Sequence, residues 1–293
     1  MEKQTRAYIY AGIAILSWST VATAFKFGLK YQQPFQMLAG ATLVTTVILF
    51  FTLIIQGKFK RLFTFTRKEY LLSILLGTFN PFIYYLILFE AYSILPAQVA
   101  QPLNLIWPIV LVLISAPLLG QKISLQSLVA LFISFIGVIL ISSQGGGKDF
   151  SKEQIPGIIL ALGSSVIWSF YWILNVRDKR DDVIKLFLGF FFSLILLIVT
   201  SLLFSKNFPI GKEAWFWSGW VGIFEMSLAF IFWLKALNLT ERTDKISNLI
   251  YIFPFISLFF IHFFVGESIH LTTIFGLFLI IAGIFVQRIG GRK

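Results

Sequence analysis

Cysteine is absent from this chain of 293 residues, and histidine occurs only twice. Disulfides and thiolate metal sites are therefore excluded, and two separated histidines make a metal centre implausible. The sequence also lacks the GxxxxGK[ST], HExxH and GxSxG patterns of nucleotide binding, metalloproteolysis and serine hydrolysis. We therefore expect no cofactor, no metal ion and no enzymatic activity, and any drive by ATP would require a separate subunit.

Charge is scarce as well, because only 13% of the residues are charged, whereas soluble domains contain about 25%. Hydrophobic residues make up 58% of the chain. Apolar runs of roughly 18–22 residues are long enough to cross a hydrocarbon layer about 30 Å thick as helices. These features predict an all-α integral membrane protein whose helices bury their surface in the lipid bilayer.

Ten membrane spans follow when hydropathy is read in windows of about 19 residues. They cover residues 8–29, 35–56, 70–91, 96–118, 124–143, 155–175, 184–204, 214–236, 244–265 and 270–288. Breaker signals separate them, with QQP at 32–34, SQGGGKD at 143–149 and NFPIGK at 207–212. The first span is longer than the apolar region of a signal peptide, so we expect it to remain as an anchor.

The basic residues are distributed unevenly between the connectors. They are scattered and form no cationic face or motif, so despite the net charge of +11 we expect no nucleic-acid partner. Seventeen of the 24 Lys and Arg residues lie in one set of alternate connectors, five lie in the opposite set, and Lys26 and Lys235 lie inside spans. This positive-inside bias predicts a multi-pass protein of the cell (inner or plasma) membrane with both termini in the cytoplasm.

The two halves of the chain share residues in the same order and at nearly constant spacing. The matched pairs are Gly77 with Gly222, Asn80 with Glu225, Ala91 with Ala236, Pro108 with Pro254, Gly120 with Gly266 and Gly137 with Gly283. Each half holds five spans, an odd number, so the second copy enters the membrane upside down. We predict a 5+5 inverted-topology repeat, with residues 1–143 as the first copy, 144–154 as a connector and 155–293 as the second copy. Such repeats are typical of transporters with a substrate site near the middle of the membrane.

Several short motifs carry a more specific resemblance. Trp18-Ser19-Thr20, LIWP at 105–108, LLGQK at 118–122, VIW at 166–168 and VGE at 265–267 resemble the drug/metabolite transporter superfamily, and within it the EamA-type ten-helix exporters. The Trp-Ser-Thr and Trp-Pro pieces are similar to the aromatic amino-acid exporter branch. The resemblance spans the whole chain and departs at Gln121, whose paired position holds Glu267. It implies a central cavity lined chiefly by spans 1, 3, 4, 6, 8 and 9.

Glu225 lies near the middle of the eighth span, where a charge costs about 2.5–3.5 kcal/mol or more. Its repeat mate is Asn80, followed by Pro81, which frees a backbone carbonyl in the third span. We predict that Glu225 anchors a cation or exchanges a proton during transport. The alternative is a structural carboxylic acid that is kept neutral by burial and bonded to a neighbouring helix.

Aromatic and amide residues complete the candidate cavity, as an alternative to plain helix packing. Its candidate lining residues, besides Asn80 and Glu225, are Trp18, Thr20, Gln101, Asn104, Trp107, Trp168, Tyr171, Asn248 and Tyr251. Aromatic faces would bind flat or cationic ligands by stacking and cation–π contact, and amides would bind polar groups. Trp172 and Asn175 follow the same helical face but are expected in the aromatic belt at the membrane boundary, and Gln98 is expected near the outer end of its span.

Three other ionisable residues are candidates for gating or coupling. Lys26 and Glu90 fall near the outer ends of their spans, where they would pair as a gate or extend separately to the interface. His262 is either a proton relay or a packing residue on an aromatic-rich helix, and Lys235 is expected to extend to the interface.

These features predict a secondary transporter that exports small metabolites, such as amino acids or drug-like and aromatic compounds. Export would proceed by alternating access as the two halves rock around the cavity, with proton coupling as an open question. The alternative on the same scaffold is a passive facilitator or channel, or a flippase for lipid-linked groups. Substrate, direction, coupling ion and oligomeric state are not specified by the sequence.

Overall fold

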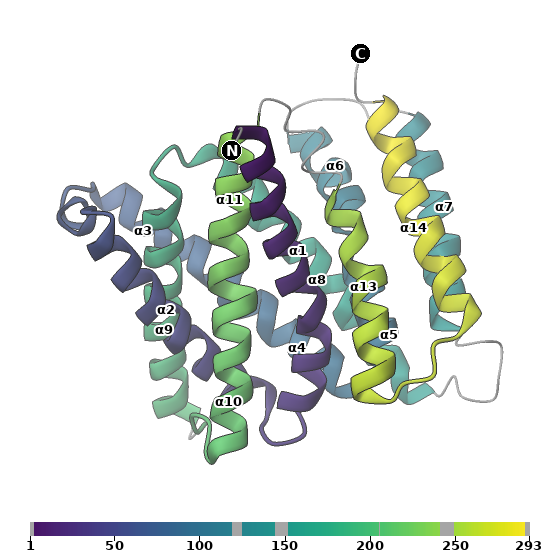
Figure 1. The fold of residues 1–293 in the computed structure, drawn as a ribbon, viewed down its shortest axis with the longest axis horizontal. Helices are drawn as coiled ribbons and strands as arrows, with labels where there is room; N and C mark the ends of the chain where they lie inside the picture. The colour runs from purple at the N-terminus through teal and green to yellow at the C-terminus, as the bar shows by residue number, and fades with distance from the viewer. Residues whose placement is uncertain (1–2, 119–124, 144–151, 205, 241–248, 291–293) are drawn as a thin grey trace. The chain divides into compact units, whose positions relative to one another are not determined.

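The structure is a computed structural model that describes residues 3–118, 125–143, 152–204, 206–240 and 249–290. The regular elements of these residues are all helices, with η marking short 3-10 or π-helical segments (Figure 1). In chain order they are α1 (Lys3–Gly28), α2 (Pro34–Ile55), η1 (Phe59–Phe63), α3 (Arg67–Gly77), η2 (Thr78–Ile83), α4 (Tyr84–Ile94), α5 (Ala97–Asn104), α6 (Trp107–Leu118), α7 (Leu125–Ser142), η3 (Lys152–Gln154), α8 (Ile155–Arg177), α9 (Asp182–Phe204), α10 (Lys212–Trp220), η4 (Val221–Leu228), α11 (Ala229–Leu239), η5 (Ile250–Ile252), α13 (Phe253–Phe260), η6 (Ile261–Val265) and α14 (Leu271–Gly290).

The helices agree with the predicted spans. Six are long and apolar enough to cross a membrane, namely Lys3–Gly28, Pro34–Ile55, Arg67–Ile94, Lys152–Asn175, Asp182–Phe204 and Lys212–Leu239. Shorter apolar helices cover Leu128–Ile141, Phe253–Val265 and Leu271–Val286, and the fourth predicted span is divided between α5 and α6. The prediction of an all-α, multi-pass membrane protein is confirmed.

Prolines explain two of the interruptions within spans. A proline has no backbone N–H, so it cannot donate to the carbonyl four residues earlier. Pro108 leaves the carbonyl of Asn104 without that donor, and α5 ends at Asn104. Pro81 acts in the same way in the third span, where η2 is π-helical between α3 and α4. The eighth span contains a π-helical segment too, η4, although its sequence VGIFEMSL holds no proline.

The chain forms two compact units, and each takes helices from both halves of the sequence. Unit 1 contains residues 1–86 and 179–265, and unit 2 contains residues 87–178 and 266–293. These units describe packing and not sequence repeats, so the predicted division at residues 144–154 stays a prediction.

Small residues determine the close helix contacts of unit 1. Ala7, Ala11 and Ala14 form a buried stripe on α1, against which Trp233 and Ala236 of α11 pack (Figure 1). Such stripes allow helix backbones to approach within a membrane, where van der Waals packing rather than the hydrophobic effect holds helices together.

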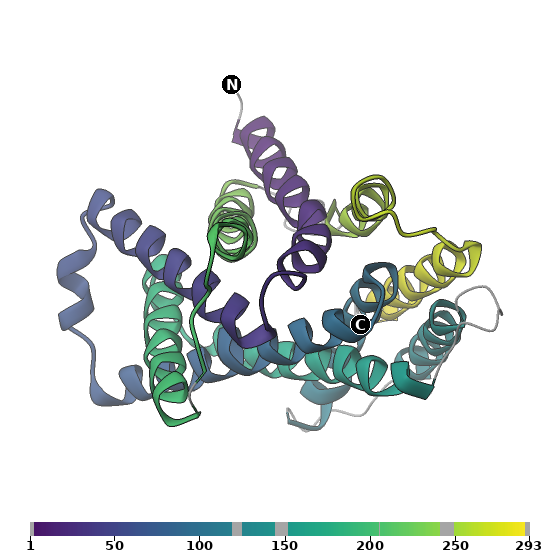
Figure 2. The same ribbon diagram turned by 90° about the horizontal axis from the view of Figure 1, so that it is seen from below.

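Unit 2 has a comparable contact between α7 and α14, which lie side by side in Figures 1 and 2. A Cβ atom added at Gly137 would lie 2.6 Å from the carbonyl oxygen of Gly276, and one added at Gly276 would lie 2.6 Å from that of Gly137. Only glycine permits this backbone approach. The hydroxyl of Ser134 also donates a long hydrogen bond, 3.5 Å, to the Ile280 carbonyl.

Candidate functional site

The ionisable residue of the eighth span, Glu225, lies in the π-helical segment η4 of unit 1. The hydroxyl of Tyr85, on α4, donates a hydrogen bond of 2.8 Å to Glu225 Oε1. The Tyr85 side chain is fully buried. This bond reduces the cost of placing a carboxyl group inside a membrane helix. Tyr85 is not among the predicted site residues, because nothing in the run FIYYLILF indicates which aromatic residue meets the eighth span.

Asn80, the predicted mate of Glu225, is buried in η2 with 3% of its surface exposed. Its backbone is extended (φ −142°, ψ 120°), as is common before a proline, and the Asn80–Pro81 peptide bond is cis. No donor among the described residues reaches its Oδ1 atom. Because buried amide oxygens normally accept a hydrogen bond, Asn80 is equipped to accept one from a substrate or a water molecule.

Trp18 and Thr20, both on α1, have partners within unit 1. The Trp18 ring packs edge-on against Phe230, at 6.0 Å between centroids, and against Trp233, at 5.5 Å. Thr20 Oγ1 donates to the Ser17 carbonyl and accepts a 3.2 Å hydrogen bond from Trp220 Nε1. These are helix-packing contacts, and the role of both side chains as cavity lining stays a prediction.

The predicted amides of the fourth span lie on α5 in unit 2 and differ in their contacts. Asn104 Nδ2 donates a 2.8 Å hydrogen bond to the hydroxyl of Ser164 on α8. Gln101 is buried, and its Oε1 atom has no hydrogen-bond donor within the described part of the chain. Asn104 thus connects two helices, and ligand binding by Gln101 stays a prediction.

Four aromatic residues gather where α6 meets α8 in unit 2. The rings of Trp107 and Trp172 are stacked, at 6.5 Å and 17°, and those of Trp168 and Tyr171 at 5.4 Å and 28°. Trp168 and Trp172 meet edge to face at 6.0 Å. We call Trp107, Trp168, Tyr171 and Trp172 the aromatic cluster. Three members were predicted as cavity residues, and Trp172 was instead assigned to the membrane boundary.

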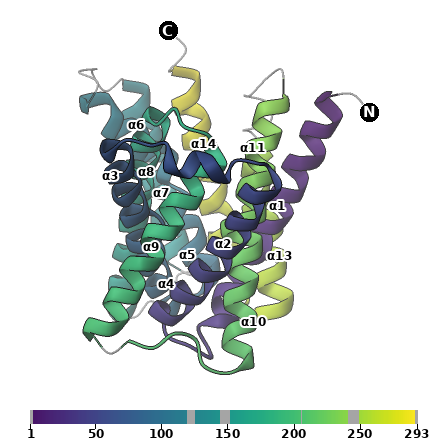
Figure 3. The same ribbon diagram turned by 90° about the vertical axis from the view of Figure 1, so that its left-hand side faces the viewer.

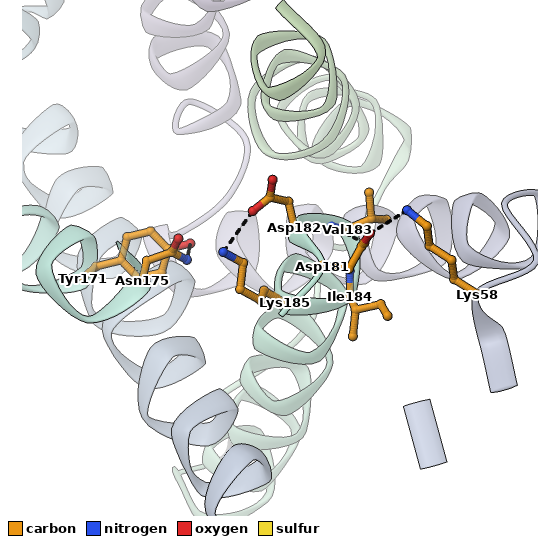
Figure 4. Close-up of polar contacts among 8 residues, drawn as sticks. All are labelled: Lys58, Tyr171, Asn175, Asp181, Asp182, Val183, Ile184 and Lys185. Atoms are coloured by element: carbon orange, nitrogen blue, oxygen red, sulfur yellow. Dashed lines mark hydrogen bonds and ion pairs between the residues drawn. The ribbon is translucent and has the colours of Figure 1, made fainter. Parts of the chain in front are cut away.

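Some of the polar groups around the aromatic cluster form hydrogen bonds with neighbouring residues. Asn175 Nδ2 donates to the Tyr171 hydroxyl at 3.2 Å (Figure 4). The Ser169 hydroxyl donates to the Trp107 carbonyl at 3.0 Å, just beyond the break between α5 and α6. The Trp172 indole N–H is buried and meets no acceptor among the described residues. The cluster therefore combines stacking faces with a buried donor.

Glu267 and Gln98 have structural roles in unit 2. The Glu267 carboxylate accepts the backbone N–H groups of Ala97, at 2.8 Å, and Gln98, at 3.1 Å, and so caps the start of α5. Carboxylates are favourable at helix N-termini because unpaired N–H groups and the helix dipole converge there. The Gln98 side chain donates to the Ser268 carbonyl and accepts from the His270 N–H and the Thr273 hydroxyl. Gln98 thus fastens the loop after Gly266 to α5.

The remaining candidates are dispersed. Lys26 is half-buried near the end of α1 in unit 1, and Glu90 is exposed on α4 in unit 2, so their pairing stays a prediction. His262 is exposed and meets the edge of Phe263 at 5.0 Å. Lys235 is exposed, and its ammonium group lies 5.7 Å from the Tyr10 ring centroid. Asn248 lies outside the described residues, as does the side chain of Tyr251, whose backbone belongs to η5.

An ion pair joins two connectors of unit 1 near the ends of α2 and α9. Lys58 Nζ lies 2.7 Å from Asp181 Oδ2 (Figure 4). Burial alone raises the pKa of Asp181, but the hydrogen bond and charge of Lys58, with the N–H groups of Ile184 and Val183, lower this pKa below its usual value. Lys185 forms a second pair with Asp182, at 2.9 Å. The first pair joins two connectors, and the second lies within the first turn of α9.

The comparisons with known proteins begin with a family match over nearly the whole chain. The sequence model of the EamA-like transporter family matches residues 5–143 and 155–288. The chain belongs to this family. The resemblance noted in the sequence is thereby confirmed, and this EamA-like transporter is a multi-pass membrane protein.

Individual relatives agree with the family assignment. The chain is 29% identical to the aromatic amino acid exporter YddG of Ancylobacter novellus over 51% of this chain and 53% of the exporter, so the match spans about half the length of that relative. It is 22% identical to the uncharacterized transporter YvbV of Bacillus subtilis over 96% and 91% of the two chains. A solved crystal structure of a protein has the same fold, with a TM-score of 0.67 and 23% identity over 99% of this chain and 98% of that chain.

Proposed function

We propose that this EamA-like transporter is a secondary transporter that exports small metabolites by alternating access, and that it is not an enzyme. The observation that carries the proposal is a carboxyl group within a spanning helix, held by the Tyr85 hydroxyl at 2.8 Å, in a π-helical segment. Ionisable groups inside membrane spans are costly and usually serve transport, and π-helical insertions are frequent at functional sites.

The predicted inverted repeat supports the transport mechanism. The two midspan π-helical segments, η2 and η4, contain the repeat mates Asn80 and Glu225. In unit 1 the first span packs against the ninth, as α1 against α13. In unit 2 their repeat mates, the sixth and fourth spans, pack as α8 against α5 and α6. An inverted repeat would relate these contacts by its pseudo-twofold axis.

The substrate class follows from the open polar atoms and the aromatic cluster. Stacked rings favour flat or cationic groups. The buried Trp172 N–H can donate to a carboxylate, and the buried Gln101 Oε1 can accept from an ammonium group. The partial match to an aromatic amino acid exporter agrees with this chemistry. We therefore propose amino acids and aromatic or drug-like compounds as substrates.

Glu225 is proposed to couple export to a proton or cation. Among the described residues, Tyr85 is the donor to this carboxyl group, which therefore retains acceptor capacity for such a partner. The chain is proposed to lie in the cell membrane with both termini in the cytoplasm, because seventeen basic residues lie in one set of connectors and five in the other.

The test is accumulation of a metabolite panel, including aromatic and aliphatic amino acids, in inverted membrane vesicles with and without a proton gradient. We expect at least one aromatic compound to accumulate, and only when the gradient is present. Equal movement with and without the gradient would instead support a passive facilitator. Conductance above carrier turnover would indicate a channel, and transfer of labelled lipid-linked groups between leaflets would indicate a flippase.

A further inference from the structure

The segment that runs from the end of α2 into the first two residues of α3, residues 56–68, combines exposed cations with an exposed aromatic ring. Its sequence, QGKFKRLFTFTRK, contains five basic residues and no acidic residue. Lys60, Arg61, Arg67 and Lys68 are exposed. Phe63 is exposed over 75% of its surface, beside these charges. We call residues 56–68 the basic connector.

The ends and middle of the basic connector are held in place by contacts within unit 1. Lys58 pairs with Asp181 at 2.7 Å. The Tyr70 hydroxyl donates to the carbonyl of Leu62, which lies between Arg61 and Phe63. The guanidinium of Arg180 lies 5.2 Å from the Phe65 ring centroid. The exposed cations and Phe63 are therefore presented by an ordered backbone.

The acidic residue that follows the basic connector, Glu69, accepts hydrogen bonds from Thr66. Glu69 Oε2 accepts from the Thr66 N–H at 2.7 Å and from the Thr66 hydroxyl at 2.8 Å, in a capping box at the start of α3. Asp181 is likewise engaged by Lys58. The Lys58–Asp181 pair is neutral as a whole, and Glu69 keeps one negative charge, so the four exposed cations Lys60, Arg61, Arg67 and Lys68 leave a positive surplus.

The basic connector lies where two spanning helices leave the hydrocarbon. It follows Ile55, the last residue of α2, which is 84% exposed, and its last two residues, Arg67 and Lys68, begin α3. Figure 3 shows η1, the dark blue segment of the connector, running crosswise to α2 and α9 at their ends. We therefore expect Phe63 and the exposed cations at the level of the lipid headgroups, where aromatic rings and basic side chains are favoured.

We propose that the basic connector binds anionic phospholipid headgroups through Lys60, Arg61, Arg67 and Lys68, with the ring of Phe63 inserted at the headgroup–acyl boundary. Charge complementarity identifies the occupant, because four exposed cations on an acid-free segment match a layer of phosphate-bearing lipids. An exposed phenylalanine among the cations distinguishes this surface from a purely solvated loop, which gains nothing from an apolar ring. This interaction is independent of the transported substrate.

The absence of native cysteine makes a direct test possible with the full chain in vesicles. Phe63→Cys provides a single attachment point for an environment-sensitive fluorophore. Vesicles of phosphatidylcholine alone are compared with vesicles that also contain phosphatidylglycerol. We expect the label to be blue-shifted, and quenched by lipids with a shallow acyl-chain quencher, only when phosphatidylglycerol is present. High salt should reverse both effects, because it screens headgroup attraction.

A second measurement removes the charges. Neutralising Lys60, Arg61, Arg67 and Lys68 to Gln is expected to raise the phosphatidylglycerol content needed for the half-maximal shift, on the order of tenfold. The salt titration uses the label variant alone, so the test stands even if the fourfold variant fails to fold.

The matched control is Ile210→Cys in the connector between α9 and α10. Ile210 is 71% exposed like Phe63, but its neighbouring cations are only Lys206 and Lys212, opposed by Glu213. We expect its label to respond much less to phosphatidylglycerol. An equal response of the two labels, or a response of the residue-63 label that ignores salt and headgroup charge, would overturn the proposal.

Discussion

The hydroxyl of Tyr85 and the carboxylate of Glu225, 140 residues apart in sequence, are joined by a hydrogen bond of 2.8 Å. Both residues belong to unit 1, and both lie at or beside π-helical segments of long spanning helices. A fully buried tyrosine that donates to a membrane-embedded carboxyl group can either hold it permanently or release it as the carboxyl group changes charge or partner. Mutations distinguish these two roles.

Substitution of Glu225 tests the transport role. Glu225→Gln keeps the size of the side chain and an oxygen acceptor for Tyr85, but it removes the ionisable group. We expect gradient-driven export to be abolished while the amount of protein in the membrane is unchanged. The control is Glu213→Gln, at an exposed site in the first turn of α10. Normal export by the Glu225 variant across a range of pH would show that this carboxyl group is structural.

Removal of the tyrosine hydroxyl tests the energetic coupling of the pair. Tyr85→Phe leaves the ring in place and deprives Glu225 of its donor, so we expect a stability loss of about 1–3 kcal/mol. Thermal unfolding in detergent, measured for Tyr85→Phe, for Glu225→Ala, which removes the acceptor, and for the double variant, provides a double-mutant cycle. We expect a coupling of about 0.5–3 kcal/mol between the two sites. Strictly additive losses would contradict a direct interaction.

The contact of α3 with α9 predicts an asymmetry between two glycines of unit 1. A Cβ atom at Gly77 would collide with the carbonyl oxygen of Gly189, whereas one at Gly12 would have no atom within 4 Å. We expect Gly77→Ala to destabilise the protein by about 1–3 kcal/mol, as overpacking does elsewhere. Gly12→Ala should be neutral or slightly stabilising, since alanine favours helix. Equal melting temperatures of the two variants would argue against this close approach.

The pair of Lys58 and Asp181 predicts a pH dependence. Because the pKa of Asp181 is lowered in the folded protein from its ordinary value of 3.8, its contribution is present above that value and is lost as pH falls through the lower folded pKa. We expect Asp181→Asn to cost about 0.2–1 kcal/mol at neutral pH, a size typical of solvent-accessible pairs. Melting curves of wild type and variant should converge only in strong acid. If the melting temperatures of wild type and variant differed by the same amount in strong acid, the charge of Asp181 would not be the cause of the difference.

The cap on α5 predicts a specific role for Glu267. Glu267→Ala removes the acceptor of the Ala97 and Gln98 N–H groups, so we expect a loss of about 1–2 kcal/mol. Glu267→Gln retains one oxygen and should lose less. Glu153→Gln, at an exposed position in η3 of the same unit, serves as the control. Indistinguishable melting temperatures of the Ala and Gln variants and wild type would exclude the capping role.

The sequence by itself predicted the membrane class, the ten helices and the family, because hydropathy, proline positions and short motifs are local properties. It also drew attention to Glu225 and Asn80, since polar residues stand out in apolar runs. The break after Asn104 was foreseeable from Pro108, which withholds one specific hydrogen bond.

Only the tertiary structure decided which side chains meet. The decisive contacts join positions 65 to 170 residues apart. They are the hydrogen bond from Tyr85 to Glu225, the stacking of Trp172 on Trp107, and the cap that Glu267 forms on the start of α5. The physical reason is that a membrane helix is apolar on nearly all faces, so its sequence does not mark the face that packs. The face that packs is determined by small residues such as Gly77, Gly137 and Gly276, because they allow two helix backbones to approach closely.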